Sequence, residues 1–326
     1  MKILFSRKIV SDVMELIPKD EFDIVMWEEE NSVMPRELFL KEVVDADAIF
    51  INVTDRIDEE VFSCAKNLKV IGTMAVGFDN IDIKEATKRN IPVGHTPDVL
   101  SEAVAELALT LMFACARRIV ESMDFIKENK WQSWGPYLFA GQKITGAKLG
   151  IIGMGRIGNE LAKMARGLNM DVSYFNRSRK IEIEEQLGVR YKDLEMLLQE
   201  SDYVVMLAPA TNETYHMMKY EQFALMKPTS IFINVSRGTT VDENSLYQIL
   251  KEKKIFAAGL DVFEKEPIDQ KHPLLSLDNV IAVPHIGSAT VETRDKMVEI
   301  TLKNIFNGLK GEPLLHAVNP EVYMKN

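Results

Sequence analysis

The sequence has few of the features that mark a secreted, membrane or metal-dependent protein. Only two cysteines occur, Cys64 and Cys115, and both lie among apolar neighbours. We therefore expect reduced, buried thiols in a cytoplasmic protein. The N-terminus lacks the long apolar region of a secretory signal, and no apolar run reaches the roughly 20 residues that a membrane span needs. No H-E-x-x-H or C-x-x-C pattern is present, so we expect no metal site.

Excess positive charge is also lacking. The formal net charge of -10 at pH 7 argues against a nucleic-acid or anionic-membrane partner. A small anionic substrate would then need a local positive group. The chain is 46% hydrophobic and 27% charged, which is typical of a globular protein, and its 326 residues are enough for two domains.

The first hundred residues alternate between short apolar runs and helical patterns. Strands are expected at residues 2–6, 22–27, 48–53, 68–74 and 91–94. This alternation predicts a parallel sheet with crossover helices. No phosphate-binding glycine pattern follows the first strand, so this is not expected to be the cofactor domain. The loop at residues 75–79 follows a strand at the edge where open α/β sheets bind ligands, although an ordinary loop is the alternative.

The stretch LGIIGMGRIGNEL at residues 149–161 predicts a dinucleotide site. A short apolar strand passes through Gly153, Gly155 and Gly158 into an amphipathic helix. The first glycine suits a tight turn, the second lets the backbone approach a pyrophosphate, and the third lets the helix pack on the sheet. The free N–H groups of the helix then favour the phosphates.

Further strands are expected after the glycines, at residues 171–175, 203–207, 230–235, 256–260 and 280–283. The apolar helix at residues 101–118 follows a domain boundary and suits burial between two domains or two subunits. The helix at residues 290–306 is expected to return to the first domain. The predicted fold is α/β, with two doubly wound parallel-sheet domains. A Rossmann coenzyme domain at residues 100–286 is inserted into a smaller flavodoxin-like substrate domain at residues 1–99 and 287–326.

The end of the second strand after the glycines favours NADP(H) as cofactor. An acidic residue at this point would bind the ribose hydroxyls of NAD and repel a 2′-phosphate. Here the position holds Asn176, followed by Arg177, Ser178 and Arg179. Arginine offers planar, charged donors that suit a phosphate. We therefore expect NADP(H) to be preferred, with NAD(H) possible; solvated loop charges are the alternative interpretation of the arginines.

Three polar residues stand at or just past expected strand ends: Arg237, Glu266 and His285. Each alone could be structural, as a surface ion pair, a loop acid or a core histidine. Together they fit carbonyl reduction, because arginine can grip a carboxylate and polarise a carbonyl. Histidine can supply the proton that follows hydride transfer. A glutamate beside the histidine would stabilise the imidazolium.

With these residues in place, the chain resembles the D-isomer-specific 2-hydroxyacid dehydrogenase family over nearly its whole length. Within that family it is most similar to the glyoxylate and hydroxypyruvate reductases, including those called 2-ketogluconate reductases. The resemblance rests on motifs that occur in order: AVGFDNIDI (residues 75–83), TPDVLSEAVAELAL (96–109), LGIIGMGRIG (149–158), MKPTSIFINVSRGTTVDE (226–243), AAGLDVFEKEP (257–267) and VPHIGSAT (283–290).

The resemblance implies roles for individual residues. Arg237, Glu266 and His285 would form the catalytic set, with His285 as proton donor, and the substrate carboxylate would bind the N–H groups of Val76 and Gly77. The remaining implied contacts are Arg156 and Ile157 at the pyrophosphate, Pro209 and Val235 along the cofactor groove, Asp261 at the nicotinamide carboxamide, Gly287 at the cofactor and Ser288 at the substrate.

The resemblance also implies a homodimer through the coenzyme domains, with an exchanged loop at residues 132–143. Which of Trp134, Tyr137 and Leu138 would reach the partner's substrate pocket stays open. The expected activity is reduction of a small 2-ketoacid, glyoxylate or hydroxypyruvate, with NADPH. Two alternatives are a 2-keto-D-gluconate reductase and a nicotinamide-sensing binding protein similar to the related corepressors. Side chains near Val53, Thr54 and Met74 are expected to decide substrate size.

Overall fold

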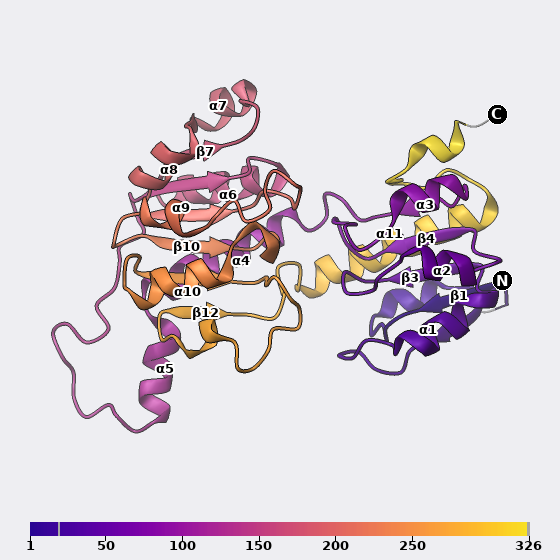
Figure 1. The fold of residues 1–326 in the computed structure, drawn as a ribbon, viewed down its shortest axis with the longest axis horizontal. Coiled ribbons are helices and arrows are strands. Elements are labelled where there is room, and N and C mark those ends of the chain that lie inside the picture. The colour runs from indigo at the N-terminus through magenta and orange to yellow at the C-terminus, as the bar shows by residue number, and fades with distance from the viewer. Residues whose placement is uncertain (19, 325–326) are drawn as a thin grey trace. The chain divides into compact units, whose positions relative to one another are not determined.

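The computed structural model describes residues 1–18 and 20–324. The chain divides into two compact units (Figure 1). The first unit contains Met1–Leu100 and Ala289–Asn326, and the second contains Ser101–Ser288. Each unit is built on one parallel β-sheet, as the alternating pattern predicted. No helix in the described part of the chain is long and apolar enough to cross a membrane.

The sheet of the first unit has the strand order β2-β1-β3-β4-β5, which is the flavodoxin-like order. All of its strand pairs are parallel. Its strands are short and strongly apolar, because both faces of the sheet are covered by helices. The strands are β1 (Lys2–Phe5), β2 (Asp23–Met26), β3 (Ala48–Ile51), β4 (Val70–Thr73) and β5 (Val93–Gly94), and the α-helices are α1 (Arg36–Glu42), α2 (Glu59–Cys64), α3 (Ile83–Lys88) and α11 (Val291–Lys310).

Helix α11 returns from the C-terminal part of the chain to the first unit because its apolar side packs closely on β3 and β4. Gly72 in β4 makes room for it, since an added Cβ would lie 2.9 Å from Cγ2 of Thr301. The helix begins at the N-cap Thr290, whose side chain accepts the N–H of Thr293, and ends at Gly311 in the left-handed conformation. The C-terminal helix is therefore an integral layer of the first unit.

The second unit contains a seven-stranded parallel sheet in the order β12-β11-β10-β9-β6-β7-β8. The chain runs outward from β6 to β8 and then returns to β9 on the other side of β6. This reversal creates the switch point at which doubly wound sheets bind dinucleotides. The strands are β6 (Lys148–Ile152), β7 (Asp171–Phe175), β8 (Arg190–Tyr191), β9 (Tyr203–Met206), β10 (Ile231–Asn234), β11 (Ala257–Leu260) and β12 (Val280–Ala282).

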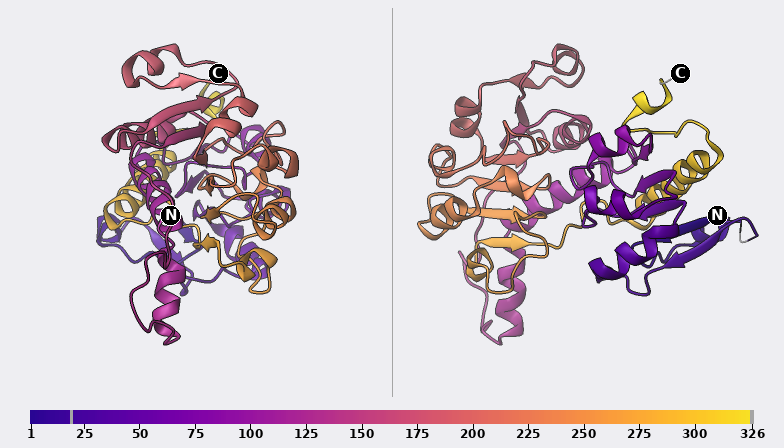
Figure 2. Two further views of the ribbon diagram at one scale, coloured as in Figure 1. Left: turned by 90° about the vertical axis from the view of Figure 1, so that its left-hand side faces the viewer. Right: turned by 45° about the vertical axis from the view of Figure 1, so that its right-hand side comes forward.

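Helices cover both faces of this sheet (Figure 2). One face packs against α8, α9 and α10, and side chains such as Val204 and Phe232 point into that core. The other face packs against α4 and α6. The helices of the unit are α4 (Ser101–Ala116), α5 (Ile119–Lys127), α6 (Arg156–Gly167), α7 (Ile181–Leu187), α8 (Leu194–Glu200), α9 (Tyr220–Ala224) and α10 (Glu243–Lys251).

The apolar character of α4 is explained by packing inside the second unit. Its buried face lies on β10, β11 and α6 of the same unit. The expected burial between two domains or two subunits stays a prediction. Gly259 in β11 lets the helix approach, because an added Cβ would lie 3.1 Å from Cβ of Leu111 and 3.2 Å from Sγ of Cys115.

Candidate active site

The glycine loop between β6 and α6 has the geometry of a phosphate cradle. Gly153 has φ +106°, and a Cβ there would lie 2.5 Å from the backbone N of Ala208, so only glycine fits. A Cβ on Gly158 would lie 2.7 Å from the carbonyl of Gly153. A Cβ on Gly155, by contrast, would meet nothing within 4 Å. No side chain caps the helix at Gly155.

The first turn of α6 therefore begins beside open space at Gly155, a residue without a side chain to cap the helix. Arg156 and Ile157 are the first two residues of this helix, where the resemblance placed the pyrophosphate. The positive end of the helix dipole and the exposed N–H groups favour a bound phosphate. The donor set and the space at Gly155 fit a dinucleotide.

Asn176 braces the glycine loop. Its Oδ1 accepts the N–H of Met154 at 2.8 Å, and its Nδ2 donates to the carbonyl of Met154 at 3.3 Å. Both ends of the amide are thus bound to the backbone of the glycine loop. In the sequence, Asn176 was notable only because it stands where a carboxylate would bind the ribose of NAD. The structure gives a second reason for an amide at this position, namely its two hydrogen bonds to Met154.

The two arginines after Asn176 differ in their surroundings. Arg179 forms a two-point ion pair with Glu184, with Nε 2.8 Å from Oε1 and Nη2 2.7 Å from Oε2. The hydrogen bond from Arg179 holds the pKa of Glu184 below its ordinary value. Arg177 and Ser178 are exposed on the loop that follows β7. Arg177 therefore stands at the loop surface, while Arg179 is held by a carboxylate.

Arg237, Glu266 and His285 follow three neighbouring strands of the second sheet. Arg237 comes after β10, Glu266 after β11 and His285 after β12, and parallel strands bring their carboxyl ends to one edge. Glu266 and His285 are in direct contact, with Oε2 of Glu266 2.6 Å from Nδ1 of His285. The other carboxylate oxygen of Glu266 accepts the N–H of Phe263 at 3.0 Å.

The charge of this group is set by its neighbours. Burial raises the pKa of Glu266, but His285, the Phe263 N–H and the charge of Arg237 outweigh it and hold the pKa below its ordinary value. Glu266 is therefore ionised at neutral pH and stabilises a protonated imidazole. A carboxylate can only accept, so Nδ1 of His285 carries a proton and Nε2 is the nitrogen left for proton exchange.

Asp261 fixes the turn that presents His285. Its carboxylate accepts the N–H of Ile286 at 2.6 Å and that of Gly287 at 2.8 Å, and its carbonyl accepts the N–H of His285 at 3.0 Å. His285 itself has φ +53°, in the left-handed region. Burial raises the pKa of Asp261 to about 6, against the opposing effect of these N–H groups.

The other residues expected at the cofactor or substrate also follow strands of the second unit. Pro209 comes shortly after β9, Val235 directly after β10, and Gly287 and Ser288 directly after His285. Val235 and Gly287 are buried, whereas Pro209 is exposed. Their contacts with a cofactor stay predictions.

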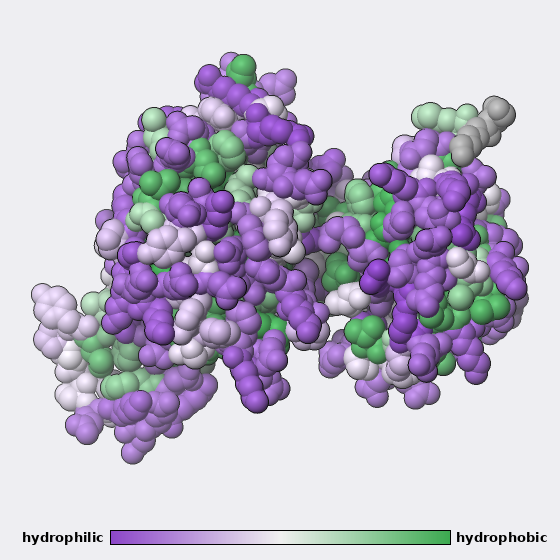
Figure 3. Space-filling view, in the orientation of Figure 1, coloured by the Kyte–Doolittle hydropathy of each residue, from purple (hydrophilic) through white to green (hydrophobic). Residues whose placement is uncertain are grey.

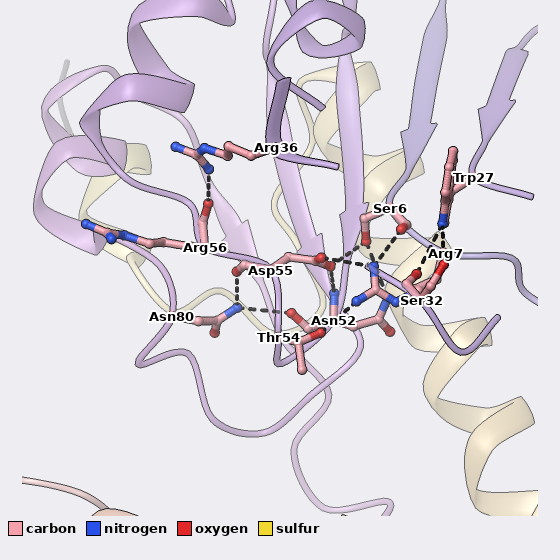
Figure 4. A network of polar contacts seen from close by, with 10 residues as sticks. All are labelled: Ser6, Arg7, Trp27, Ser32, Arg36, Asn52, Thr54, Asp55, Arg56 and Asn80. Carbon is pink, nitrogen blue, oxygen red and sulfur yellow. Dashed lines mark hydrogen bonds and ion pairs between the residues drawn. The ribbon is translucent and has the colours of Figure 1, made fainter. Parts of the chain in front are cut away.

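In the first unit, Val76 and Gly77 follow β4, on the loop that was expected to bind a carboxylate. A buried polar network lies at the same edge of this sheet (Figure 4). Its centre is Asp55, 6% exposed, whose carboxylate accepts the Ser6 hydroxyl, the Asn52 N–H at 2.7 Å and an Arg7 N–H at 3.3 Å.

Asn80 joins this network to the loop at residues 75–79 (the carboxylate loop). Its Nδ2 donates to the carbonyls of Asn52 at 3.0 Å and Asp55 at 2.7 Å. Arg7 also donates to the hydroxyl of Thr54 at 2.8 Å. The loops after β1, β3 and β4 are thus tied together by hydrogen bonds, which fix the position of the expected carboxylate-binding segment.

Sequence reasoning missed this network and a second one in the other unit. There, the Glu264 N–H donates to the side chain of Glu243 at 2.8 Å, and the Glu243 N–H donates to the side chain of Glu264 at 3.3 Å. This exchange ties the start of α10 to the loop that carries Glu266. The first network could have been predicted, because Asp55 is a polar residue shortly after an apolar strand. The second could not, because no spacing rule connects Glu243 with Glu264.

The segment after α4 presents a large apolar surface. Helix α5 and the loop that follows project away from the seven-stranded sheet (Figure 1), and hydrophobic side chains gather over them (Figure 3). Trp134 is 78% exposed and Tyr137 is 86% exposed. Exposed patches of this kind mark interaction surfaces. The other exposed members are Ile119, Val120, Met123, Ile126, Trp131 and Leu138.

A glycine cradle at the switch point, with a histidine–carboxylate pair at the same sheet edge, is the arrangement of a nicotinamide-dependent oxidoreductase. Within the described residues, no group of three or more His, Cys, Asp or Glu side chains is placed to hold a metal ion.

Comparison with known proteins identifies the family. Residues 109–287 match the model of the D-isomer specific 2-hydroxyacid dehydrogenase, NAD binding domain. The glyoxylate reductase of Pyrococcus horikoshii is 45% identical over 325 residues, which cover 98% of this chain and 96% of that protein. The glyoxylate reductase of Thermococcus litoralis is also 45% identical, over 98% of this chain and 97% of that protein. The chain belongs to the D-isomer specific 2-hydroxyacid dehydrogenase family.

Solved structures agree with this assignment. A protein from Thermus thermophilus superposes with a TM-score of 0.92 at 37% identity, covering 98% of this chain and 100% of that one. An NADPH-dependent glyoxylate/hydroxypyruvate reductase from Sinorhizobium meliloti, in complex with NADP and malonate, has a TM-score of 0.83 at 28% identity, covering 98% and 97%. The doubly wound two-domain fold predicted from the sequence is therefore confirmed.

Proposed function

We propose that this protein is an NADPH-dependent reductase of small 2-ketoacids, converting glyoxylate to glycolate and hydroxypyruvate to D-glycerate. The observation that carries the proposal is the 2.6 Å contact between Glu266 and His285 at the carboxyl edge of the sheet that holds the glycine cradle. Relatives named glyoxylate reductase, similar over nearly the full chain, support the choice of substrate.

The proposed chemistry assigns one task to each of three side chains. Bound nicotinamide would supply a hydride to the carbonyl carbon of the ketoacid. Arg237 would hold the substrate carboxylate and polarise the adjacent carbonyl. His285 would give the proton on Nε2 to the carbonyl oxygen as the hydride arrives, which yields the hydroxyl group. Glu266 would keep the imidazole protonated until that step and hold its orientation.

The substrate carboxylate would also meet the N–H groups of Val76 and Gly77, and Ser288 would contact the substrate beside His285. This part of the proposal rests on the resemblance and on the rigidity of the loop. A carboxylate site needs donors that are held in place before the substrate arrives. The hydrogen bonds from Asn80 and the Asp55 network supply that rigidity on one side of the loop.

The preference for NADP(H) over NAD(H) is supported by the loop after β7. It carries Arg177 and Ser178 at its surface and has no carboxylate at position 176. Arg179 is a weaker candidate, because its guanidinium is already held by Glu184. Arg177 is therefore the residue that we assign to the 2′-phosphate.

A homodimer through the second unit is part of the same proposal. The exposed apolar surface of α5 and residues 131–138 supports it, since a monomer would leave this surface in water. Two free cysteines, one of them buried Cys115 whose pKa burial raises to about 12, support a location in the cytoplasm.

One experiment tests substrate and cofactor together. Purified protein is assayed with NADPH and NADH in parallel against glyoxylate, hydroxypyruvate, pyruvate and 2-keto-D-gluconate, and nicotinamide oxidation is followed by absorbance. We expect the highest kcat/KM with NADPH and either glyoxylate or hydroxypyruvate. Turnover of 2-keto-D-gluconate alone, or a clear advantage for NADH, would contradict the proposal.

A further inference from the structure

His95 lies beside the loop that was assigned to the substrate carboxylate, and its backbone is firmly held there. It follows β5, the strand next to β4 in the sheet. Its N–H donates to the carbonyl of His316 at 3.1 Å, and its own carbonyl accepts Nδ2 of Asn304 at 3.2 Å. The next residue, Thr96, donates its N–H to the carbonyl of Ala75 at 2.8 Å. The backbone around His95 is thus fixed against both α11 and the start of the carboxylate loop.

The side chain of His95 is bonded to the loop itself. Its Nδ1 lies 3.0 Å from the carbonyl oxygen of Val76. A carbonyl can only accept a hydrogen bond, so Nδ1 carries the proton in this contact. Phe78 meets the imidazole ring edge-on with centroids 5.9 Å apart, and His316 does so at 6.5 Å. The ring is therefore in contact with two aromatic side chains while its Nδ1 faces the carbonyl of Val76.

The carbonyl of Val76 and the N–H of Gly77 belong to the same peptide group. A donor bound to the carbonyl oxygen draws electron density toward that oxygen and makes the N–H of the same peptide a stronger donor, because chains of hydrogen bonds polarise one another. The same bond fixes the orientation of the peptide plane. Both effects act on the N–H of Gly77.

We propose that His95 is a positioning residue for the substrate carboxylate. It orients the Val76–Gly77 peptide and strengthens the Gly77 N–H as a carboxylate donor, without touching the substrate. This inference rests on the proposed function in one respect, namely that the loop binds the carboxylate of a 2-ketoacid. It adds a histidine that no spacing rule or catalytic motif singled out.

The test compares two variants that differ in one hydrogen-bond donor. His95→Leu keeps an apolar side chain against Phe78 and removes the donor. His95→Asn keeps an N–H group close to the position of Nδ1. Affinity is measured by titrating oxalate, an unreactive dicarboxylate, into the NADPH-loaded full-length protein, and KM for glyoxylate and for NADPH is measured alongside. A positioning role predicts that His95→Leu weakens oxalate binding by about 5- to 10-fold, as expected for one hydrogen bond.

For His95→Leu, the same role predicts a matching rise in KM for glyoxylate, while kcat and KM for NADPH stay within about twofold of the wild-type values. His95→Asn should recover most of the oxalate affinity. His316→Leu is the matched control, because it removes the other imidazole against the His95 ring and leaves the Val76 bond intact. Melting temperatures report whether each variant is folded. If His95→Leu does not fold, His95→Gln, which moves the donor farther from the backbone, takes its place.

Three results would overturn the inference: oxalate affinity unchanged in His95→Leu, the same loss in His316→Leu as in His95→Leu, or no oxalate binding by the wild-type protein. Failure of the proposed function gives a different pattern. In that case the wild-type protein reduces none of the ketoacids, while the oxalate titration still decides the role of His95.

Discussion

Nδ1 of His285 lies 2.6 Å from Oε2 of Glu266, and each residue follows one of two adjacent parallel strands. The second oxygen of Glu266 accepts the N–H of Phe263, which helps to orient the carboxylate toward the imidazole. Because β11 and β12 are neighbours in the sheet, the distance between the two side chains is set by the strand spacing and by two short loops. The imidazole of His285 and its carboxylate partner are thus positioned by the scaffold.

Replacing Glu266 by Gln should move the pH profile of reduction. The neutral amide no longer stabilises the imidazolium, so the alkaline fall of kcat/KM should shift to lower pH, and kcat should drop by roughly 10- to 100-fold. Steady-state rates with NADPH and glyoxylate across a pH series give both values. A variant with the profile of the wild type would show that Glu266 does not act on His285.

Replacing Gly238 by Ala should separate the loops that carry Arg237 and Glu266. A Cβ at Gly238 would overlap the backbone of Phe263 and Glu264, and backbone cannot move aside as a flexible side chain can. We expect a loss of stability of about 1 to 3 kcal/mol and a lower kcat. Urea unfolding and steady-state rates measure the two effects.

Gly167→Ala is the matched control for Gly238→Ala. Gly167 is the last residue of α6, and an added Cβ there would meet nothing within 4 Å. Alanine in a helix is favoured over glycine by roughly 0.5 to 1 kcal/mol, so this variant should be as stable as the wild type or slightly more so. Equal losses in both variants would refute the steric argument.

Asp261 should make stability depend on pH in a particular direction. Its pKa is raised from 3.8 to about 6 in the folded protein, so the folded state binds more protons than the unfolded state between these values. Its contribution to stability is therefore fully present below about pH 4 and is lost as pH rises to about 6. The change is on the order of 3 kcal/mol. Urea unfolding of the wild type and of Asp261→Asn across this interval should show the difference between them falling with pH; parallel curves would exclude it.

Replacing Arg177 by Ala should weaken NADPH binding selectively. The loss of one charge-assisted contact to the 2′-phosphate corresponds to about a 10-fold higher KM for NADPH, while KM for NADH stays within about twofold. Arg179→Ala is the comparison variant, since its guanidinium is already paired with Glu184, and it should have the smaller effect. A similar rise of KM for both cofactors would assign Arg177 a structural role instead.

The strands of both sheets were predictable because burial on two faces produces apolar runs. The run at residues 171–175 matches β7 in full, and the other expected strands extend one or more residues past the observed ends. Val53 and Met74 show why: both are apolar, yet they follow their strands and lie outside the ladder. Strand β8 was missed because its two residues, Arg190 and Tyr191, are exposed at the sheet edge and carry no apolar signal.

The polar residues at strand ends were predictable for a topological reason. Parallel strands bring their carboxyl ends to one edge, so Glu266 and His285 could be expected to meet although 19 positions separate them. Contacts that depend on side-chain direction were not predictable. The amide of Asn176 turns back to Met154, and the imidazole of His95 turns to the carbonyl of Val76, and neither is encoded in spacing or in composition.

In the proposed mechanism, His285 donates the proton in an NADPH-dependent reduction of a small 2-ketoacid. It is tested most directly by comparing kcat of the wild type and of His285→Ala with saturating NADPH and glyoxylate, after both proteins are shown to bind NADPH equally. We expect steady NADPH consumption by the wild type and a decrease of roughly 10²- to 10⁴-fold in kcat of the variant. Equal rates for the two proteins, or no consumption by the wild type, would contradict it.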